Sequence, residues 1–385
     1  MRKRLEYILK HNLIIQQVYR LIMSNLFRLV GLFVKTDENL VLISSFAGLR
    51  YNDSPKVISE YLTSHDEYQH LDIIWALEKP DEIEIPGCKK VKIDSLSYFL
   101  TALKAKYWIT NVNIERGLHF KKKSTKFLNT WHGISFNKCG NAVNGRKDFD
   151  CSNVDLFLYQ CQYEKDIFIR DFNALEEKLA LTGLPRNDEL YHVTDSEVAS
   201  LKNKLNIPHD KKVILYAPTW RDSTDAGKSY EFNSPMDLKY WEEKLGDEYV
   251  LLYRIHHFVT KLLGVQFNDF VRDVSTYSTI NDLMIVSDIL VSDYSATLAD
   301  FSILERPIIC FGYDYEEYAA NRGFYVDMNI VMPSGVLHTQ EEVVNYIKNM
   351  DYRTECEKTV KVKNYFLEEG GNATEKSVNL FFNGA

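Results

Sequence analysis

The chain lacks the short motifs that mark several large classes of enzyme. Its 385 residues contain no G-x-G-x-x-G and no G-x-x-x-x-G-K-[ST], which weighs against a dinucleotide-dependent oxidoreductase and a P-loop NTPase. No G-x-S-x-G nucleophile elbow is present, and no cysteine has an evident histidine partner. Nucleophilic hydrolase chemistry therefore has little support.

Cysteine is scarce, and an excess of positive charge is missing. The six cysteines show no C-x-x-C and no paired spacing; they are Cys88, Cys139, Cys151, Cys161, Cys310 and Cys356. This pattern favours reduced thiols in a cytoplasmic protein over a disulfide framework or a zinc site. No Asp or Glu has the spacing to complete a metal site with the histidines, so we expect neither a metal nor a cofactor. A net charge of −8 weighs against wholesale binding of nucleic acid.

Long hydrophobic runs are absent too. No stretch approaches the ~20 uncharged residues that a membrane-spanning helix needs, and no small-residue cleavage site indicates a signal peptide. The first 36 residues instead combine many apolar side chains with one acid, Glu6, and with the basic residues Arg2, Lys3, Arg4, Lys10, Arg20, Arg28 and Lys35. We expect a basic amphipathic helix within residues 1–36 that lies on an anionic membrane surface. Packing on the protein's own core is the alternative.

The chain does contain a regular alternation of strand and helix patterns, which is typical of parallel sheets covered by helices. Helical patterns lie at Pro55–Thr63, Leu96–Ala105, Tyr163–Phe172 and Asp195–Leu205. Candidate strands are Leu40–Ser44, Ile73–Ala76, Tyr107–Thr110, Phe127–Trp131, Leu156–Tyr159, Val213–Ala217, Tyr249–Ile255, Ile289–Val291 and Ile308–Phe311. The length predicts two domains, 37–195 and 196–385. We predict an α/β protein of two doubly wound, Rossmann-like domains that face a cleft.

Four motifs directly follow candidate strands, where the functional groups of α/β folds gather. The first is Trp131-His132-Gly133. His132 suits general-base work near neutral pH, and Gly133 lets a substrate approach the backbone. A structural histidine at the edge of a domain is the alternative.

The next two motifs carry cationic and aromatic side chains. In an extended strand Arg254 and His256 lie on one face, where an Arg and a His can clamp a phosphate; a surface arginine and a structural histidine are the alternative. Thr219, Trp220 and Arg221 follow another strand, and Trp220 or Arg221 could stack on a base or face a phosphate. A packed loop with Trp220 in the core would give the same pattern.

The fourth motif is Ser292-Asp293-Tyr294-Ser295-Ala296-Thr297, between an apolar strand and a helical pattern. Its hydroxyl groups would lie at a helix N-terminus, whose unpaired N–H groups and dipole bind anions. An ordinary N-cap is the alternative, since Ser and Thr cap helices widely.

Taken in order, these motifs resemble those of the CDP-glycerol glycerophosphotransferases of teichoic-acid biosynthesis. The matching segments are Ser45–Gly48, Tyr51–Lys56, Trp131–Gly133, Thr182–Asp188, Tyr216–Thr219, Arg254–His256, Ser292–Ser295, Arg306–Ile309 and Gly370–Ala373. Each motif alone is unspecific, whereas the ordered set is specific. The chain departs from the family pattern at Ile134–Asn137 after Trp-His-Gly, at Ala296 where a second serine is usual, and at His257 in place of proline.

The resemblance implies a GT-B-like fold and a peripheral enzyme at the cytoplasmic face of the cell membrane. Such an enzyme transfers glycerol phosphate from CDP-glycerol to a hydroxyl of an undecaprenyl-linked saccharide acceptor and releases CMP. On the matching positions, His132 would be the catalytic base, and His256 would be a second catalytic group beside Arg254 at the diphosphate. Substrate would also be bound by Gly133, Thr219, Trp220, Arg221, Asp293, Ser295, Thr297 and Asp300, with either Asp300 or Glu305 at the ribose.

The length of the chain resembles the single-module, primase-like members, which add the first unit to the linkage lipid. The alternatives are a chain-extending polymerase or a capsule-polymer glycerophosphotransferase, a GT-B glycosyltransferase that uses a sugar nucleotide, and an inactive membrane-bound assembly scaffold. A homo-oligomer is possible in each case.

Overall fold

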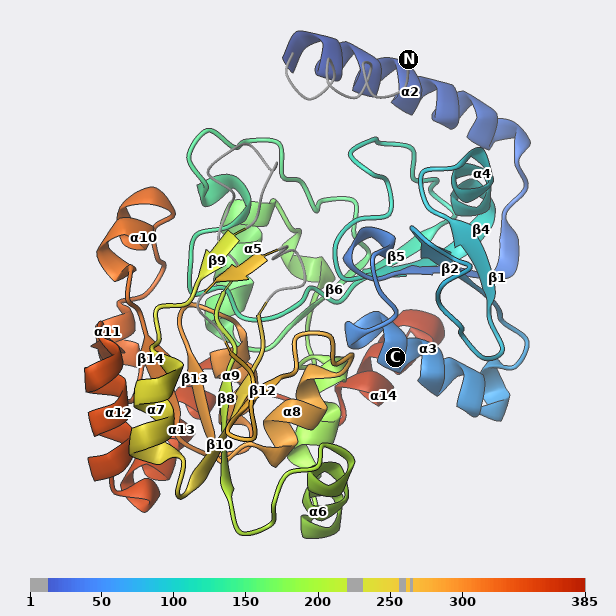
Figure 1. Cartoon of the computed structure of the whole chain (residues 1–385). Helices are drawn as coiled ribbons and strands as arrows, with labels where there is room; N and C mark the ends of the chain where they lie inside the picture. The colour runs from blue at the N-terminus through green and yellow to red at the C-terminus, as the bar shows by residue number, and fades with distance from the viewer. Residues whose placement is uncertain (1–12, 220–230, 256–260, 264–265, 385) are drawn as a thin grey trace.

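Two parallel sheets form the centres of two lobes (Figure 1) in this computed structural model, which describes residues 13–219, 231–255, 261–263 and 266–384. The first sheet has the order β3-β2-β1-β4-β5-β6-β7, and the second has the order β12-β10-β8-β13-β14-β15. Counted along the chain within each lobe, both begin 3-2-1-4-5-6, which is the order of a doubly wound nucleotide-binding fold. The predicted fold class is confirmed.

The strands of the first sheet are β1 (Asp37–Ser44), β2 (Asp72–Leu77), β3 (Lys89–Lys92), β4 (Ala105–Thr110), β5 (Lys126–Asn129), β6 (Leu156–Tyr159) and β7 (Leu179–Leu181). Those of the second are β8 (Lys212–Tyr216), β10 (Tyr249–Tyr253), β12 (Val271–Asp273), β13 (Ile289–Ser292), β14 (Ile308–Phe311) and β15 (Val336–Leu337). A separate parallel pair consists of β9 (Glu231–Asn233) and β11 (Lys261–Leu263).

The α-helices are α2 (Leu13–Phe33), α3 (Asp53–Ser64), α4 (Leu96–Lys104), α5 (Gln162–Phe172), α6 (Asp195–Lys204), α7 (Leu238–Leu245), α8 (Ile280–Val286), α9 (Thr297–Ser302), α10 (Tyr315–Asn321), α11 (Met328–Val331), α12 (Gln340–Asn349), α13 (Tyr352–Phe366) and α14 (Ala373–Val378). Shorter helical turns are η1 (Phe46–Gly48), η2 (Asp66–Tyr68), η3 (Gly140–Ala142), η4 (Glu176–Lys178), η5 (Pro185–Tyr191) and η6 (Asn379–Asn383).

Successive residues of the central strands enter two different cores. In β1, Leu40 and Leu42 belong to the core on one face of the sheet, and Val41 and Ile43 belong to the core on the other. This follows from the two-residue period of a strand. Because both faces are covered, the strands are nearly continuous apolar runs, which is why they could be recognised in the sequence.

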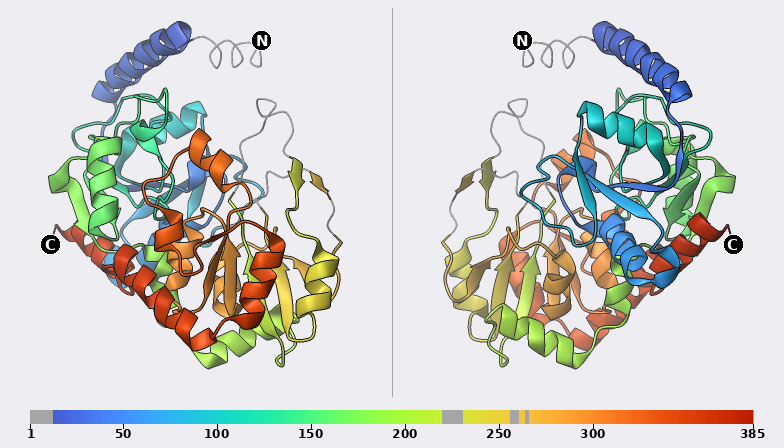
Figure 2. Two further views of the ribbon diagram at one scale, coloured as in Figure 1. Left: turned by 90° about the vertical axis from the view of Figure 1, so that its left-hand side faces the viewer. Right: turned by 90° about the vertical axis from the view of Figure 1, so that its right-hand side faces the viewer.

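The C-terminal segment ties the two lobes together. Helix α13 packs on α9 of the second lobe, and the chain then returns to the first lobe (Figure 2), where Phe381 fills the core beside β1. At the crossing, Gly183 has a φ of +77°, and a methyl group added to it would lie 2.5 Å from the carbonyl oxygen of Glu369. Residues 373–383 therefore lie with the first sheet, although the sequence analysis assigned all of 196–385 to the second domain.

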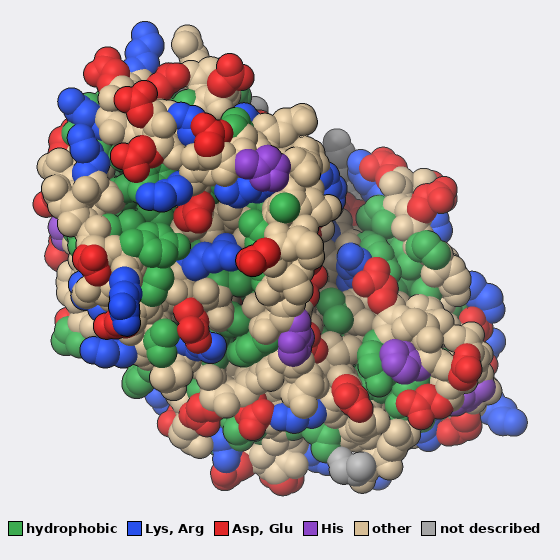
Figure 3. Space-filling model, turned by 90° about the horizontal axis from the view of Figure 1, so that it is seen from below, with side chains coloured by type: hydrophobic (Ala, Val, Ile, Leu, Met, Phe, Trp, Pro, Cys, Tyr) green, Lys and Arg blue, Asp and Glu red, His purple; other side chains and the backbone are tan. Residues whose placement is uncertain are grey.

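Helix α2 lies across the outside of the first lobe (Figure 1). Phe27 on its inner face packs against Phe99 and Phe120, with ring centroids 4.5 and 5.5 Å apart. Its outer face exposes the apolar side chains of Val18, Leu21, Ile22, Leu26, Leu29, Leu32 and Phe33. The opposite side of the molecule instead mixes acidic and basic side chains (Figure 3). Among the described residues, we find no helix both long and apolar enough to cross a membrane.

Candidate active site

The site is built where the strand order of each sheet reverses. In the first sheet this point lies between β1 and β4, and there the side-chain oxygen of Asn111 accepts the Phe46 N–H at 2.8 Å. In the second sheet it lies between β8 and β13, and there Asp293 Oδ1 accepts the N–H and the hydroxyl of Thr219 at 2.7 and 2.5 Å. Ligands of open α/β sheets bind at such reversal points.

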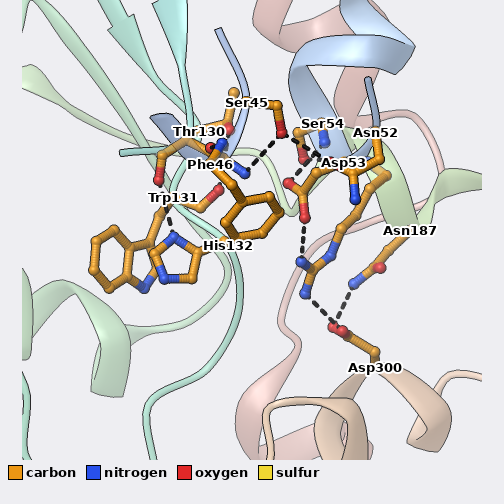
Figure 4. Close-up of polar contacts among 12 residues, drawn as sticks. Ser45, Phe46, Asn52, Asp53, Ser54, Thr130, Trp131, His132, Asn187 and Asp300 are labelled. Carbon is orange, nitrogen blue, oxygen red and sulfur yellow. Dashed lines mark hydrogen bonds and ion pairs between the residues drawn. The ribbon is translucent and has the colours of Figure 1, made fainter. Parts of the chain in front are cut away.

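His132 is oriented as a general base. Its Nδ1 lies 2.9 Å from the carbonyl oxygen of Asn111; because a carbonyl only accepts, Nδ1 carries the proton and Nε2 presents its lone pair. The ring lies between Trp131 and Phe46, at centroid distances of 3.9 and 5.6 Å (Figure 4). Burial lowers the pKa of His132, although the Asn111 carbonyl and the charge of Asp53 act against this shift. The imidazole is therefore neutral, and able to take a proton, near pH 7.

The backbone around His132 adopts conformations that side chains disfavour. Phe46, Ala47, Asp53 and Trp131 have φ values of +43°, +56°, +63° and +53°. Each such residue costs about 1–3 kcal/mol, and such residues cluster at functional sites. The turn at Trp131 is fixed by its N–H, which donates to Asn129 Oδ1 at 2.9 Å. Strand β5 consequently ends at Asn129, two residues before the predicted end.

A buried ionic cluster joins the two lobes beside His132 (Figure 4). Arg186 of η5 bonds Asp53 Oδ2 of the first lobe and Asp300 Oδ2 of the second, each at 2.6 Å. The three side chains are only 14%, 5% and 7% exposed. Burial acts to lower the pKa of Arg186, but the two carboxylates raise it above its usual value. The guanidinium thus stays charged and bridges the lobes.

These contacts bear on Asp300, which the sequence analysis named beside Glu305 as a candidate to bind the ribose. Arg186 takes one of its carboxylate oxygens, and the Asn187 amide donates to the other at 2.7 Å. Burial raises the pKa of Asp300, while Arg186 and Asn187 oppose this shift. Both oxygens are engaged within the protein, so the geometry favours a bridging role, and ribose binding stays a prediction.

The loop that follows β5 abuts the fourth motif of the second lobe. A methyl group added to Gly133, whose φ is +125°, would lie 2.7 Å from Ala296 Cβ and 2.8 Å from Arg186 Nη2, so glycine is required here. Next to Ala296, the hydroxyl oxygens of Ser295 and Thr297 lie 2.9 Å apart at the start of α9. The structure thus brings Gly133, Ser295 and Thr297 together from separate lobes.

Arg254 of the second lobe feels the positive charge of Arg50 from the first lobe. Arg254, which follows β10, donates to the carbonyl oxygens of Val274 and Tyr277 at 3.1 and 2.7 Å, and these bonds fix its guanidinium. Burial, followed by the positive charge of Arg50, lowers the pKa of Arg254 to about 10. Arg50 lies between η1 and α3 of the first lobe. Guanidinium groups contributed by both lobes suit a diphosphate.

Three of the predicted site residues, Trp220, Arg221 and His256, lie outside the described residues, and their roles stay predictions. Asp293 and Thr219 bond to each other, so together they hold the loop after β8. None of the six cysteines forms a disulfide, as predicted. Among the described side chains, no three His, Cys, Asp or Glu residues are grouped so that they could hold a metal ion.

Sequence reasoning missed three residues of this site. Asn111 directly follows β4, so the rule that singled out His132, a polar residue just after a strand, could have found it. Arg50 borders the matched segment Tyr51–Lys56, and Arg186 lies within Thr182–Asp188. Neither arginine carries a local signal of its function, because each acts through residues far away in the sequence.

Two facing doubly wound lobes, with a neutral histidine on one and arginines on both, suit a group transferase that acts on a diphosphate donor. The sequence profile of the CDP-Glycerol:Poly(glycerophosphate) glycerophosphotransferase family matches residues 26–383. The chain belongs to this family.

Relatives match over nearly the whole chain. A teichoic acid glycerol-phosphate transferase of Staphylococcus aureus is 35% identical over 90% of this chain and 93% of its own length. A teichoic acid poly(glycerol phosphate) polymerase of Bacillus spizizenii is 30% identical over 96% of this chain and 98% of its own. The solved structure of a variant of the wall teichoic acid polymerase TagF with CDPG superposes with a TM-score of 0.83, at 28% identity and with 96% of each chain covered.

Proposed function

We propose that this enzyme transfers glycerol phosphate from CDP-glycerol to a hydroxyl of a membrane-lipid-linked saccharide and releases CMP, in the synthesis of teichoic acid or a related cell-wall polymer. The observation that carries the proposal is the neutral His132, whose Nε2 is available as a base beside the Gly133 loop and the start of α9. The names of the full-length relatives support the donor, the transferred group and the polymer.

In this reaction the acceptor oxygen attacks the phosphorus that bears glycerol, and its proton passes to His132 Nε2. The bond from this phosphorus to the CMP oxygen breaks, and CMP leaves with the electron pair. Arg254 and Arg50 stabilise the charge on CMP, and the hydroxyls of Ser295 and Thr297 donate to phosphate oxygens. Positioning and electrostatics suffice for phosphoryl transfer, so no covalent enzyme intermediate is needed.

The number of units added is the finer part of the proposal. Chain length favoured a primase-like enzyme, but the Bacillus polymerase is matched over 98% of its own length, so length does not separate the two. Primase-like addition of a single unit and chain extension are therefore the two candidates. CMP release from CDP-glycerol, with and without a synthetic lipid-linked disaccharide, and the mass of the product test both.

In this assay a product with one added glycerol phosphate supports the primase-like reaction. A series of products, each longer by one glycerol phosphate, supports the polymerase. UDP-sugars in place of CDP-glycerol are the control for a glycosyltransferase. Binding of CDP-glycerol without turnover on any acceptor would favour an inactive scaffold, and absence of CDP-glycerol binding would contradict the proposal at its donor.

We also infer that α2 attaches the enzyme to the anionic cytoplasmic surface of the membrane. Leu32 and Phe33 are 79% and 85% exposed, and Arg28 and Lys35 supply positive charge. An apolar face of this kind, rimmed by basic residues, suits the interface of an anionic bilayer. Packing on the protein, the alternative, accounts only for the inner face around Phe27.

Replacing both Leu29 and Leu32 by Glu should abolish binding to phosphatidylglycerol vesicles, measured by cosedimentation. The two carboxylates would oppose both apolar burial and attraction to the anionic surface. Ile330→Glu is the matched control, because Ile330 is 81% exposed but lies on α11 of the second lobe. Equal sedimentation of the double variant and the control would contradict the inference.

The depressed pKa of His132 predicts an unusual pH profile. A base must be unprotonated, and a lowered pKa keeps it so at lower pH; kcat/KM should therefore fall only below about pH 6.5, the ordinary midpoint for histidine. The residual kcat/KM of His132→Asn should not show this fall at acidic pH. If kcat/KM already falls at or above that midpoint, or if the fall persists in the variant, His132 is not the base.

A further inference from the structure

A cavity of about 220 Å³ with polar and apolar walls lies between α2 and two loops of the first lobe. Its walls are formed by the loop after β4 between Val112 and His119, by the loop between Arg146 and Cys151, and by Arg20 of α2. We propose that this cavity binds one neutral sugar ring of the saccharide acceptor. The inference rests on the proposed function and gives the acceptor saccharide a binding site separate from that of the donor.

The charges in the cavity favour a neutral polyhydroxyl ligand over an anion. Arg20 and Arg146 both face Asp148, with N–O distances of 3.3 and 3.6 Å. Asp150 and Glu115 bring two further carboxylates into the wall. Sugar hydroxyls can donate to carboxylates and accept from guanidinium groups at the same time. The two guanidinium groups are paired with Asp148, and further acidic side chains share the wall, so a diphosphate is disfavoured here.

The size and the surface of the cavity agree with this ligand. Its volume lies below the roughly 300–1,000 Å³ of pockets that hold drug-sized ligands, which fits a single ring better than a nucleotide. Phe149 provides apolar surface for the C–H groups of a sugar, with the Arg146 guanidinium 4.9 Å from its ring centroid. Glu115 is held in place by the Lys121 N–H at 2.7 Å and by the Asn153 amide. This part of the wall is therefore preorganised.

The cavity also lies in the right place for an acceptor that comes from the membrane. The Phe149 ring in its wall lies edge-on to the Trp131 ring, with centroids 6.4 Å apart. The Trp131 ring in turn packs against the His132 ring, with centroids 3.9 Å apart. On its other side, Arg20 belongs to α2, which overlies these loops (Figure 1). A lipid-linked saccharide would therefore pass the cavity before its terminal hydroxyl reaches the base.

The test compares Arg146→Ala and Asp150→Ala with Lys147→Ala, the control, whose side chain is exposed on the same loop but does not line the cavity. A short-chain, water-soluble lipid-linked disaccharide is the acceptor, without vesicles, so that membrane binding does not contribute. We expect the KM for the acceptor to rise about tenfold in each cavity variant, as for the loss of one hydrogen bond to a charged group. The affinity for CDP-glycerol, measured by calorimetry, should stay unchanged. Acceptor KM values equal to that of Lys147→Ala would overturn the proposal.

A direct binding measurement separates this inference from the proposed function. If the wild-type enzyme released no CMP with any saccharide, saturation-transfer NMR would be carried out with the free disaccharide and the full chain. Binding that Arg146→Ala weakens would support the subsite even though the reaction had failed. No binding of the disaccharide to the wild-type chain would overturn the subsite, whatever the enzyme does with CDP-glycerol.

Discussion

His132→Asn should lower kcat about 10²- to 10⁴-fold, the contribution of a general base, and leave the affinity for CDP-glycerol nearly unchanged. The asparagine amide can still donate to the Asn111 carbonyl, so the loop should keep its shape while Nε2 is lost. CMP release in the presence of acceptor measures the loss, and calorimetry measures donor binding.

His192→Asn is the matched control for this substitution. His192 Nε2 also faces a backbone carbonyl oxygen, that of Gly371, at 2.8 Å, but it lies at the crossing between the lobes and away from the site. Its replacement should leave turnover close to normal. Near-normal turnover of His132→Asn would mean that another group takes the proton from the acceptor.

Arg186→Met should destabilise the folded chain by about 3–5 kcal/mol, the typical cost of leaving a buried charge without its partner. Asp53 and Asp300 would then face each other across the lobes without a cation between them. Urea unfolding measures the stability. Turnover of the protein that remains folded should also fall, because Arg186 lies against the Gly133 loop.

Arg353→Met is the control for Arg186→Met. Arg353 pairs with Glu357 at the surface, and the two side chains are 90% and 68% exposed, so its loss should cost less than about 1 kcal/mol. Adding Asp300→Asn to Arg186→Met should restore part of the lost stability by removing one buried charge. Equal stability of the Arg186 and Arg353 variants would show that the cluster does not hold the lobes together.

The central strands could be predicted from sequence because they are buried on both faces. Leu156–Tyr159 and Ile308–Phe311 were predicted with the bounds that β6 and β14 have, and the predicted strands around β1 and β4 begin a few residues late. Strand β3 was missed because it lies at the edge of the sheet and reads Lys89-Lys90-Val91-Lys92, with no apolar run. Strands β7, β12 and β15 are too short to show a period.

The site could be predicted only where its functional residues lie together in one segment of the sequence. His132 and Gly133 are adjacent and follow a strand, so their motif is visible locally. The bridge of Asp53, Arg186 and Asp300 is assembled from three distant segments, and its charges carry meaning only once both lobes are folded. The sequence could therefore suggest Asp300 or Glu305 for the ribose but could not show that Arg186 and Asn187 donate to Asp300 in the folded chain.

The return of the C-terminal segment also determines the order in which the molecule can be completed during synthesis. Phe381 packs against Tyr107 of β4, with ring centroids 5.6 Å apart, so the lobe that leaves the ribosome first lacks part of its core until residues 373–383 have been made. A nascent chain that stops before residue 373 would expose this apolar patch to chaperones and proteases. The first lobe thus becomes fully packed only in chains that include residues 373–383.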